Sequence, residues 1–502
     1  MVHEKAGYAW LKEHFKLEQV FLDTESVILK IASINKEDAQ RHHYPVSYRP
    51  KDNNTMGHLT FAMKNEALNL YCLTNLFKFA DIKAEIEKAL LTNPTGKYNR
   101  LIGFFYEMLS NRSLDIPELT TGNYINAIDE KTYYVTPAIR EKKFRINNNF
   151  IGSGQLSMLL KRNDNLLSNE ELRRLARQPL ADCPVELLER ATRYLISIET
   201  KSSNEIESEK ISSSKQMKFM FALETINDEE LTKQKLIDTL NIIKDKHYQE
   251  LDYRYQQNYL GSSGYGYSTA EYIPPKPADA HHLMDEWFKI RDKVLKSDMP
   301  VIAKAAALSS CFVYIHPFMD GNGRLSRYIM QDTLYRSGIT DKQTSLPLSI
   351  GILRDITKYY QILSNTSLRI MKFVKFDMHD NQSVTVVNDT ADLYKHLSFD
   401  EHALYLSSVA QKVATELIPE EINKLKQFDI LFKELNEHMD LPGKDLGLIA
   451  TLLMNNEGKI SNKKRKGVLQ SVHQESLDQA EQIYADLKDD STNNSPAYKH
   501  SY

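Results

Sequence analysis

The chain has 502 residues, 41% of them hydrophobic and 26% charged, which is ordinary for a globular protein and predicts about three domains. Its 64 basic and 67 acidic side chains leave a net charge of -3, so no overall field favours nucleic acid or an anionic membrane as the main partner. Three widely spaced cysteines without CxxC spacing argue against a disulfide framework or a zinc site and favour a reducing cytoplasm. The longest apolar stretch, 301–315, contains Lys304 and is shorter than the roughly 20 residues of a membrane-spanning helix, so we expect no membrane partner.

Residues 1–170 are predicted to form a helical N-terminal domain. The first residues mix charges into every turn, lack the apolar segment of a secretory signal, and predict one or two short helices before residue 40. A polar loop is expected over 41–54. From 57 to 120 apolar residues recur at helical intervals, and 119–149, without a clear period, predicts a loop with a short hairpin.

The central region, 171–375, alternates helices with one segment of different character. Asn227 and Glu230 form a capping box that opens a helix ending near His247. Tyrosines flanking a Gly-rich turn predict a β-hairpin over 253–275. A buried helix is expected from Asp298 and Pro300 to residue 315, followed by a helix over 323–337 that Gly338 caps.

The C-terminal region, 376–487, is predicted to be a mainly helical domain. A short strand is expected between 380 and 395, and a turn at 441–443 interrupts the later helices. The basic run 463–466 is interpreted as a solvated loop in preference to a nucleic-acid contact. Residues 488–502, rich in Ser, Asn and Lys, predict a disordered tail.

The run from His316 to Arg327 lies between two predicted helices and carries several groups suited to one reaction. Gly321 and Gly323 permit positive φ and close approach, so successive backbone N–H groups can cradle an anion at the start of the next helix. Asp320 supplies a hard oxygen ligand for Mg²⁺. His316 could take a proton from an incoming hydroxyl.

Two arginines complete this pattern. Arg324 and Arg327 are three residues apart on the following helix, so both guanidinium groups can face the same phosphate chain. The run also contains Asn322 between the two glycines. Together these residues predict a phosphate-binding loop beside a general base.

The complete run, HPFMDGNGRLSR, matches the Fic signature HPFxxGNGRxxR, and the chain therefore resembles the Fic family. The resemblance implies a mainly α fold, a Fic-type helical bundle with a β-hairpin flap, here flanked by helical N- and C-terminal domains. It implies that His316 is the general base, that Asp320 is the magnesium ligand, and that the residues of the phosphate site are Gly321, Asn322, Gly323, Arg324 and Arg327. Because the residue after Asn322 is glycine and not lysine, the chain is similar to members that transfer AMP from Mg·ATP to a hydroxyl.

Three further segments resemble parts of that family. The hairpin 253–275 resembles the flap that holds a target segment by β-strand addition. Tyr359 and Tyr360 follow the signature where the family lines its adenine pocket. Upstream, SNEIES resembles the inhibitory motif [ST]xxxE[GN], with Ser203 and Glu207 in its key positions within an inhibitory helix at about 198–212, and Glu207 is then expected to pair with Arg327. Ser208 departs from the usual Gly or Asn.

The predicted function is AMP transfer to a Ser, Thr or Tyr hydroxyl of another protein or of the chain itself, with a homodimer left open. One alternative is a Fic-type enzyme that transfers another nucleotide or removes AMP. Another is a DNA-binding regulatory or toxin–antitoxin-like protein, in which the Fic core senses a nucleotide. Steep salt dependence of DNA retention would separate the last alternative from an enzyme.

Overall fold

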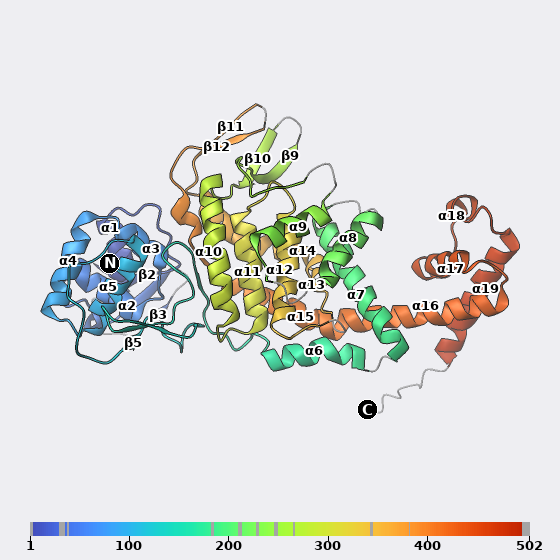
Figure 1. The fold of residues 1–502 in the computed structure, drawn as a ribbon, viewed down its shortest axis with the longest axis horizontal. Coiled ribbons are helices and arrows are strands. Elements are labelled where there is room, and N and C mark those ends of the chain that lie inside the picture. Colours follow the sequence, from blue (N-terminus) through green and yellow to red (C-terminus); the bar gives the residue numbers. More distant parts are fainter. Residues whose placement is uncertain are drawn as a thin grey trace. The chain divides into compact units, whose positions relative to one another are not determined.

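The computed structural model is mainly helical, as predicted (Figure 1). It describes residues 4–29, 36–37, 40–181, 185–208, 213–226, 230–244, 249–264, 267–341, 345–380 and 382–493. The chain divides into two compact units, the first comprising Met1–Ala176 and Ile196–Val413 and the second Arg177–Leu195 and Ala414–Tyr502. The division into three domains stays a prediction.

The N-terminal region combines a small sheet with a group of helices. The sheet has the order β1-β2-β4-β3 and consists of β1 (Glu4–Lys5), β2 (Glu25–Ile28), β3 (Lys36–Glu37) and β4 (Arg41–Tyr44). The helices are α1 (Gly7–His14), η1 (Val46–Tyr48), α2 (Thr55–Asn65), α3 (Leu70–Leu76), α4 (Ala80–Thr92) and α5 (Lys97–Ser110). Their apolar faces form one core, in which Leu59, Phe77 and Phe105 are fully buried.

This sheet corrects our prediction for the first 54 residues. We expected one or two helices before residue 40 and a loop from residue 41. One helix, α1, does lie among the described residues before residue 40, but 41–44 form the strand β4, which pairs in parallel with β2. Val27, Ile28 and Tyr44 are β-branched or aromatic residues that suit a half-buried pleated surface, so pairing across the sheet decides the structure of this segment.

Between residues 110 and 170 the chain forms short strands joined by loops. β5 (Ile125–Asn126), β6 (Ile139–Glu141) and β7 (Ile146–Asn148) form a sheet of order β5-β7-β6, and the antiparallel pair β6–β7 is the hairpin predicted here. β8 (Ser157–Leu159) pairs in parallel with β13 (His396–Ser398), far along the chain. The N-terminal region is therefore joined by main-chain hydrogen bonds to residues 396–398.

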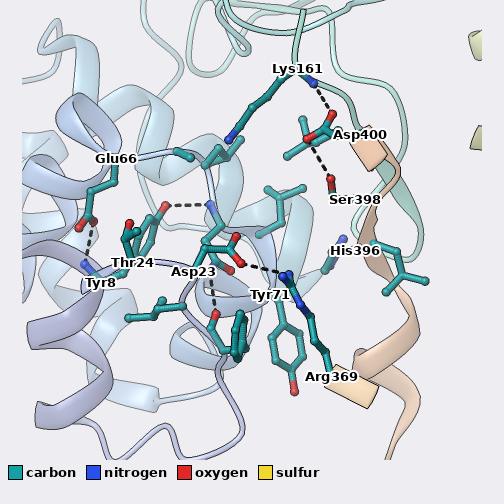
Figure 2. A pocket seen from close by; sticks show the side chains of 18 of the residues that line it. Tyr8, Asp23, Thr24, Glu66, Tyr71, Lys161, Arg369, His396, Ser398 and Asp400 are labelled. Atoms are coloured by element: carbon teal, nitrogen blue, oxygen red, sulfur yellow. Dashed lines mark hydrogen bonds and ion pairs between the residues drawn. The ribbon is translucent and has the colours of Figure 1, made fainter. Parts of the chain in front are cut away.

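A cavity of about 480 Å³ lies beside this junction (Figure 2). Its walls carry charged side chains, and Figure 2 shows three of the acids among them, Asp23, Glu66 and Asp400, bonded within the protein. Asp23 lies 3.0 Å from Arg369, and the carboxylates of Glu66 and Asp400 accept hydrogen bonds from the backbone N–H groups of Tyr8 and Lys161. These three acids are therefore already satisfied by partners within the protein.

The bundle in the centre of the chain contains most of the remaining helices. They are α6 (Asn169–Ala181), α7 (Val185–Ile206), α8 (Ser213–Glu224), α9 (Lys233–Ile243), α10 (Pro277–Leu295), α11 (Val301–Ile315), α12 (Asn322–Arg336), α13 (Leu348–Arg354), α14 (Ile356–Met371) and α15 (Asp400–Lys412). The strands are β9 (Leu260–Gly264), β10 (Tyr267–Tyr272), β11 (Phe376–Met378) and β12 (Val384–Val386), and η2 (Ala391–Tyr394) follows them. Helix α11 is buried almost throughout and packs against α10, α12 and α15, so its end is held firmly (Figure 1).

Several predictions for this bundle are confirmed, and one is shifted. Strands β9 and β10 form the antiparallel hairpin expected over 253–275, Pro300 precedes α11, and Gly338 has φ +67° just after α12. Helix α9 begins at Lys233, with Thr232 as its N-cap, because the Thr232 side chain accepts a hydrogen bond from the N–H of Lys235. Asn227, His247, Tyr265 and Gly266, which also entered our predictions, lie outside the described residues.

The second unit has its own core. The π-helix η3 (Val413–Leu417) leads into α16 (Ile418–His438), α17 (Gly443–Asn455), α18 (Asn462–Lys466) and α19 (Gln474–Asn493), and the turn predicted at 441–443 precedes α17. Helix α19 extends six residues beyond the boundary at 487 that we predicted. Arg465, from the basic run, pairs with Asp478 and Glu481, so its charge is used within the fold.

No helix in the described ranges is long and apolar enough to cross a bilayer.

Candidate functional site

The turn between α11 and α12 carries the predicted site residues. Helix α11 ends at His316, which adopts a left-handed conformation with φ 51° and ψ 58°. For a residue other than glycine this conformation costs roughly 1–2 kcal/mol, and such strain is found preferentially at functional sites. Helix α12 begins after Gly321, whose φ of 85° favours glycine, and a Cβ there would lie 2.5 Å from Leu240 Cδ1, so that leucine side chain or the loop would have to shift.

His316 is held in the tautomer that a general base requires. Its Nδ1 lies 3.2 Å from the carbonyl oxygen of Val313, and because a carbonyl can only accept, Nδ1 carries the proton and Nε2 the lone pair. The residue is 8% exposed, and burial lowers the pKa of His316 to about 4, with the nearby Arg254 guanidinium acting in the same direction. The imidazole is therefore neutral at pH 7 and able to accept a proton.

Asn322 shapes the loop from inside. Its Oδ1 accepts a hydrogen bond from the N–H of Phe318 at 3.0 Å, and its Nδ2 donates to the Phe318 carbonyl at 2.8 Å. Both side chains are buried. This reciprocal pair fixes the path between His316 and α12, so Asn322 can offer an anion its backbone N–H while its side chain holds the loop.

The start of α12 already lies against an anion, the carboxylate of Glu207. A Cβ on Gly323 would lie 2.0 Å from Glu207 Oε1, so glycine at this position is what allows the carboxylate to approach the helix terminus. The same oxygen accepts a hydrogen bond from Arg327 Nη2 at 2.6 Å. The Glu207 carboxylate thus lies between the N-terminus of α12 and the guanidinium of Arg327.

Arg327 is 1% exposed and connects α12 to the end of α7. Its Nε donates to Ser203 Oγ at 2.6 Å and its Nη2 donates to the Ser203 carbonyl at 2.8 Å, in addition to Glu207. Burial opposes its charge, but Glu207 compensates and raises the pKa of Arg327. Its Nη1 has no hydrogen-bond partner among the described residues. An unsatisfied buried donor costs about 1–3 kcal/mol, and a phosphate oxygen would satisfy it.

Asp320 is the most exposed of the predicted site residues in this loop, with 61% of its side chain accessible. Its Oδ1 accepts the N–H of Gly321 at 2.6 Å, and its Oδ2 lies 3.6 Å from Arg324 Nη2 and 4.0 Å from Lys244 Nζ. No group of three or more His, Cys, Asp or Glu side chains in the described ranges could hold a metal. One accessible carboxylate fits Mg²⁺, which is commonly bound by one or two carboxylates together with substrate phosphates.

Tyr359 and Tyr360 lie on α14, beside the end of α7. The Tyr360 hydroxyl donates to the carbonyl of Ile206 at 3.0 Å, although nearly half of the side chain is exposed. Burial raises the pKa of Tyr359, while the adjacent Arg327 opposes that shift. The two tyrosines predicted to meet adenine therefore also face the segment that carries Glu207.

Two residues that we did not predict belong to this site. Glu199 is fully enclosed, and its carboxylate accepts hydrogen bonds from the N–H and hydroxyl of Ser349 at 2.8 and 2.6 Å. Its position four residues before Ser203 on the same helix face was a signal that could have identified it. Arg254 donates to the carbonyl oxygen of His316 at 2.8 Å, and no local sequence pattern indicates that contact.

Comparisons with known proteins agree with this geometry. A family model described as Fic/DOC family matches residues 230–334, which include the whole loop and the start of α12. This segment of the chain is a Fic domain. The chain is 32% identical over 126 residues to Protein adenylyltransferase Fic of Drosophila ananassae, and 33% identical over 111 residues to the protein of the same name in Nematostella vectensis.

The aligned segments are partial. They cover 25% and 21% of this chain, and only 22% and 24% of the Drosophila and Nematostella relatives. A Fic family protein from Desulfovibrio desulfuricans gives a TM-score of 0.35 at 15% identity, over 61% of this chain and 87% of that one. A Fic domain containing signaling protein from Bacteroides thetaiotaomicron gives a TM-score of 0.35 at 18% identity, over 51% and 96%.

Proposed function

We propose that this protein transfers AMP from Mg·ATP to a Ser, Thr or Tyr hydroxyl of a target protein or of itself. The observation that carries the proposal is the pairing of a neutral, tautomer-fixed His316 with an anion-holding helix start at Gly323. A general base and a phosphate cradle within one loop are the two groups that nucleotidyl transfer to a hydroxyl needs. The relatives named protein adenylyltransferase support AMP as the group transferred.

In this mechanism the backbone N–H groups at the start of α12 bind the triphosphate, and Arg324 and Arg327 hold its β- and γ-phosphates. His316 Nε2 takes the proton of the target hydroxyl as its oxygen bonds to the α-phosphorus. The bond from the α-phosphorus to the β-phosphate bridging oxygen breaks, and pyrophosphate leaves. Asp320 would hold Mg²⁺, which when bound neutralises phosphate charge and orients the leaving group.

We further propose that Glu207 inhibits this reaction. Its carboxylate occupies the helix start and one donor of Arg327, where the terminal phosphate would bind. Exposed ion pairs contribute little, but here the arginine is almost completely buried, so the contact is shielded from water on one side. ATP could then bind in a productive position only after the carboxylate moves.

The β9–β10 hairpin is proposed to hold the target segment. Tyr272, at the end of β10, donates to the carbonyl of Tyr314 at 2.6 Å, so this end of the hairpin is fixed to the last turn of α11, next to His316. A hairpin edge binds an extended segment through main-chain hydrogen bonds, with little demand on side chains. Such a flap would present hydroxyls from varied sequences to one base.

The test compares the wild type, Glu207→Gly and the double variant Glu207→Gly/His316→Ala, each incubated with Mg·ATP labelled at the α-phosphate. Labelled protein is expected with Glu207→Gly and is expected to be lost in the double variant. Calorimetry should give the same ATP affinity for both variants, since His316 contacts the hydroxyl and not the phosphates. Retained labelling without His316 would exclude its role as base.

A parallel incubation with α-labelled UTP, CTP and GTP tests the nucleotide. Labelling from ATP alone is expected. Exclusive labelling from another nucleotide would defeat the adenylyl assignment while keeping the transferase, and failure to label with any nucleotide would defeat both.

A further inference from the structure

A single buried arginine connects the flap to the loop that carries His316. Arg254 lies just before the hairpin and is 2% exposed. Its Nε donates to the His316 carbonyl at 2.8 Å, and its backbone N–H donates to the Pro317 carbonyl, also at 2.8 Å. Its other guanidinium nitrogens donate to the carbonyls of Gln256 and Pro275, which lie on the two sides of the hairpin.

The chemistry of these contacts is specific to arginine. All the hydrogen bonds that its guanidinium makes to described residues go to main-chain carbonyls, and the planar fork directs its donors to three of them at once. A lysine ammonium is a single point on a flexible stem and cannot reproduce that geometry. Burying a charged group is costly, so its retention here indicates that holding the three carbonyls matters.

The contact to His316 falls on a strained residue. His316 is in the left-handed region, and such conformations persist only where the surroundings fix them. The hydrogen bonds to its carbonyl and to that of Pro317 supply such a restraint on two consecutive peptide units. A second bond, from Asn258 Nδ2 to the Phe318 carbonyl at 3.1 Å, continues the attachment along the loop.

We propose that Arg254 is the positioning residue that sets the register between a target segment held by the flap and the imidazole of His316. The inference rests on the proposed AMP transfer. Because one side chain holds both stems of the hairpin and the base-bearing peptide, a movement of the flap is transmitted to His316 as a unit. The residues predicted to bind ATP lie at Gly321, on α12 and on α14, and the hydrogen bonds of the Arg254 guanidinium go to His316, Gln256 and Pro275 instead.

Under this proposal, loss of Arg254 affects the transfer step and not the binding of ATP. Loss of this arginine leaves phosphate binding intact but lets the target hydroxyl and Nε2 drift apart. Misplacement of reacting atoms by about 1 Å can lower a rate by roughly 100-fold. The defect therefore falls on turnover with saturating ATP and target, and not on ATP affinity.

The experiment places Arg254→Lys in the active Glu207→Gly background. The matched control is Arg291→Lys, because Arg291 is also buried and bonds to Asp332 at 3.1 Å on α12, away from the flap and the loop. We measure turnover with Mg·ATP, ATP affinity by calorimetry, and amide hydrogen exchange over 269–275 and 316–321. Turnover is expected to fall ~10- to 100-fold in Arg254→Lys, with ATP affinity unchanged and faster exchange in both segments together.

The control should lose stability without losing turnover per folded molecule. If Arg254→Lys does not fold, Asn258→Ala takes its place, because it removes only the single hydrogen bond to the Phe318 carbonyl. Turnover is then expected to fall ~2- to 10-fold, with faster hydrogen exchange over 316–321. Parent turnover and unchanged exchange in Arg254→Lys, or in Asn258→Ala if only that variant folds, would overturn the inference. If the Glu207→Gly parent does not transfer AMP at all, the proposed function fails, and hydrogen exchange alone still decides whether Arg254 joins flap and loop.

Discussion

Two carboxylates on α7 and the turn that ends it, Glu199 and Glu207, meet the bundle in opposite ways. Glu199 is 2% exposed, accepts two hydrogen bonds from Ser349, and lies one turn before Ser203. Glu207 lies in the turn that ends the helix, its side chain is 36% exposed, and it accepts a hydrogen bond from one arginine. One acid anchors the body of the helix, and the other rests on the phosphate loop.

Under the proposed inhibition, this difference explains how the segment that carries Glu207 can block the site and still be removed from it. The body of α7 is held by buried polar groups that are costly to separate, while its end is held by a partly exposed contact. Ser208, directly after Glu207, has φ +56°. This left-handed conformation has a steric cost for a residue other than glycine. Under our proposal, inhibition is relieved by a local movement of the last turn, without undocking the helix.

The largest effect is expected from Glu207→Gly. Removing a hydrogen bond to a charged group costs about 1.5–3 kcal/mol, so AMP transfer should rise by ~10- to 100-fold. Labelling with α-labelled ATP measures it, and Glu205→Gly, an exposed acid two residues earlier, is the matched control. Equal activity in wild type and Glu207→Gly would remove the inhibitory assignment.

Removing the hydrogen bonds between Glu199 and Ser349 should change stability as well as activity. Glu199→Ala leaves the donors of Ser349 without their partner, and the free energy of unfolding should fall by about 1–3 kcal/mol. Activity should also rise, because the helix that carries Glu207 loosens. Chemical denaturation and labelling measure the two effects, and Glu189→Ala, an exposed site on the same helix, should change neither. A gain in activity without loss of stability would contradict the anchoring role.

The same residue predicts a pH dependence. Burial raises the pKa of Glu199 above its ordinary value of 4.5, so the folded state holds the proton more tightly than the unfolded state. Its contribution to stability is then fully present below pH 4.5 and is lost as pH rises through the raised pKa. Denaturation midpoints are measured for the wild type and for Glu199→Gln across this pH range. The midpoint of the variant should depend less on pH than that of the wild type, because glutamine does not titrate. Identical profiles would show that Glu199 does not titrate differently on folding.

A smaller effect of opposite sign is expected from Ser208→Gly. Glycine adopts the left-handed conformation without the steric cost, so the blocking turn should gain up to about 1 kcal/mol, and basal transfer should fall ~2- to 5-fold. Ser208→Ala keeps the Cβ while removing the hydroxyl, and it should leave the rate unchanged. A rate that falls equally in both variants would assign the effect to the hydroxyl instead of the backbone.

The smallest effect is expected from Tyr360→Phe, which removes only the hydrogen bond to the Ile206 carbonyl. This bond holds the end of α7 but is partly exposed, so its loss should raise basal transfer by no more than ~2- to 5-fold. Phenylalanine keeps the aromatic ring. Tyr405→Phe, on α15, loses a comparable bond to the Asp355 carbonyl and serves as the control. A large fall in ATP affinity in Tyr360→Phe would show that the hydroxyl serves the nucleotide instead.

The contact between Glu207 and Arg327, 120 positions apart, was predicted only because the family resemblance implies it, and the structure joins the two at 2.6 Å. The loop 316–327 itself could be predicted because its chemistry is local to one short run, in which Gly321 adopts a left-handed conformation that favours glycine. The same locality explains the predicted start of α11 and the hairpin at 253–275. The roles of these site residues, a homodimer and a cytoplasmic location stay predictions.

What could not be predicted depends on contacts between distant parts of the chain. The bond from Arg254 to His316 and the bonds from Ser349 to Glu199 join residues 62 and 150 positions apart, and no period or motif announces them. The N-terminal sheet was missed for the same reason, since β2 and β4 become strands by pairing with each other. The predicted cap at Asn227 gave way to Thr232, a competing cap five residues later.

The parallel pairing of β8 with β13 has a consequence for how the protein is made. Ser157 and His396, 239 positions apart, bond through their side chains at 2.8 Å within that pair. A ribosome must therefore have released residues up to about 398 before β8 can pair, although the N-terminal core is built from residues earlier in the chain. Fragments that end at 375 would leave β8 as an open strand edge, exposed to self-association.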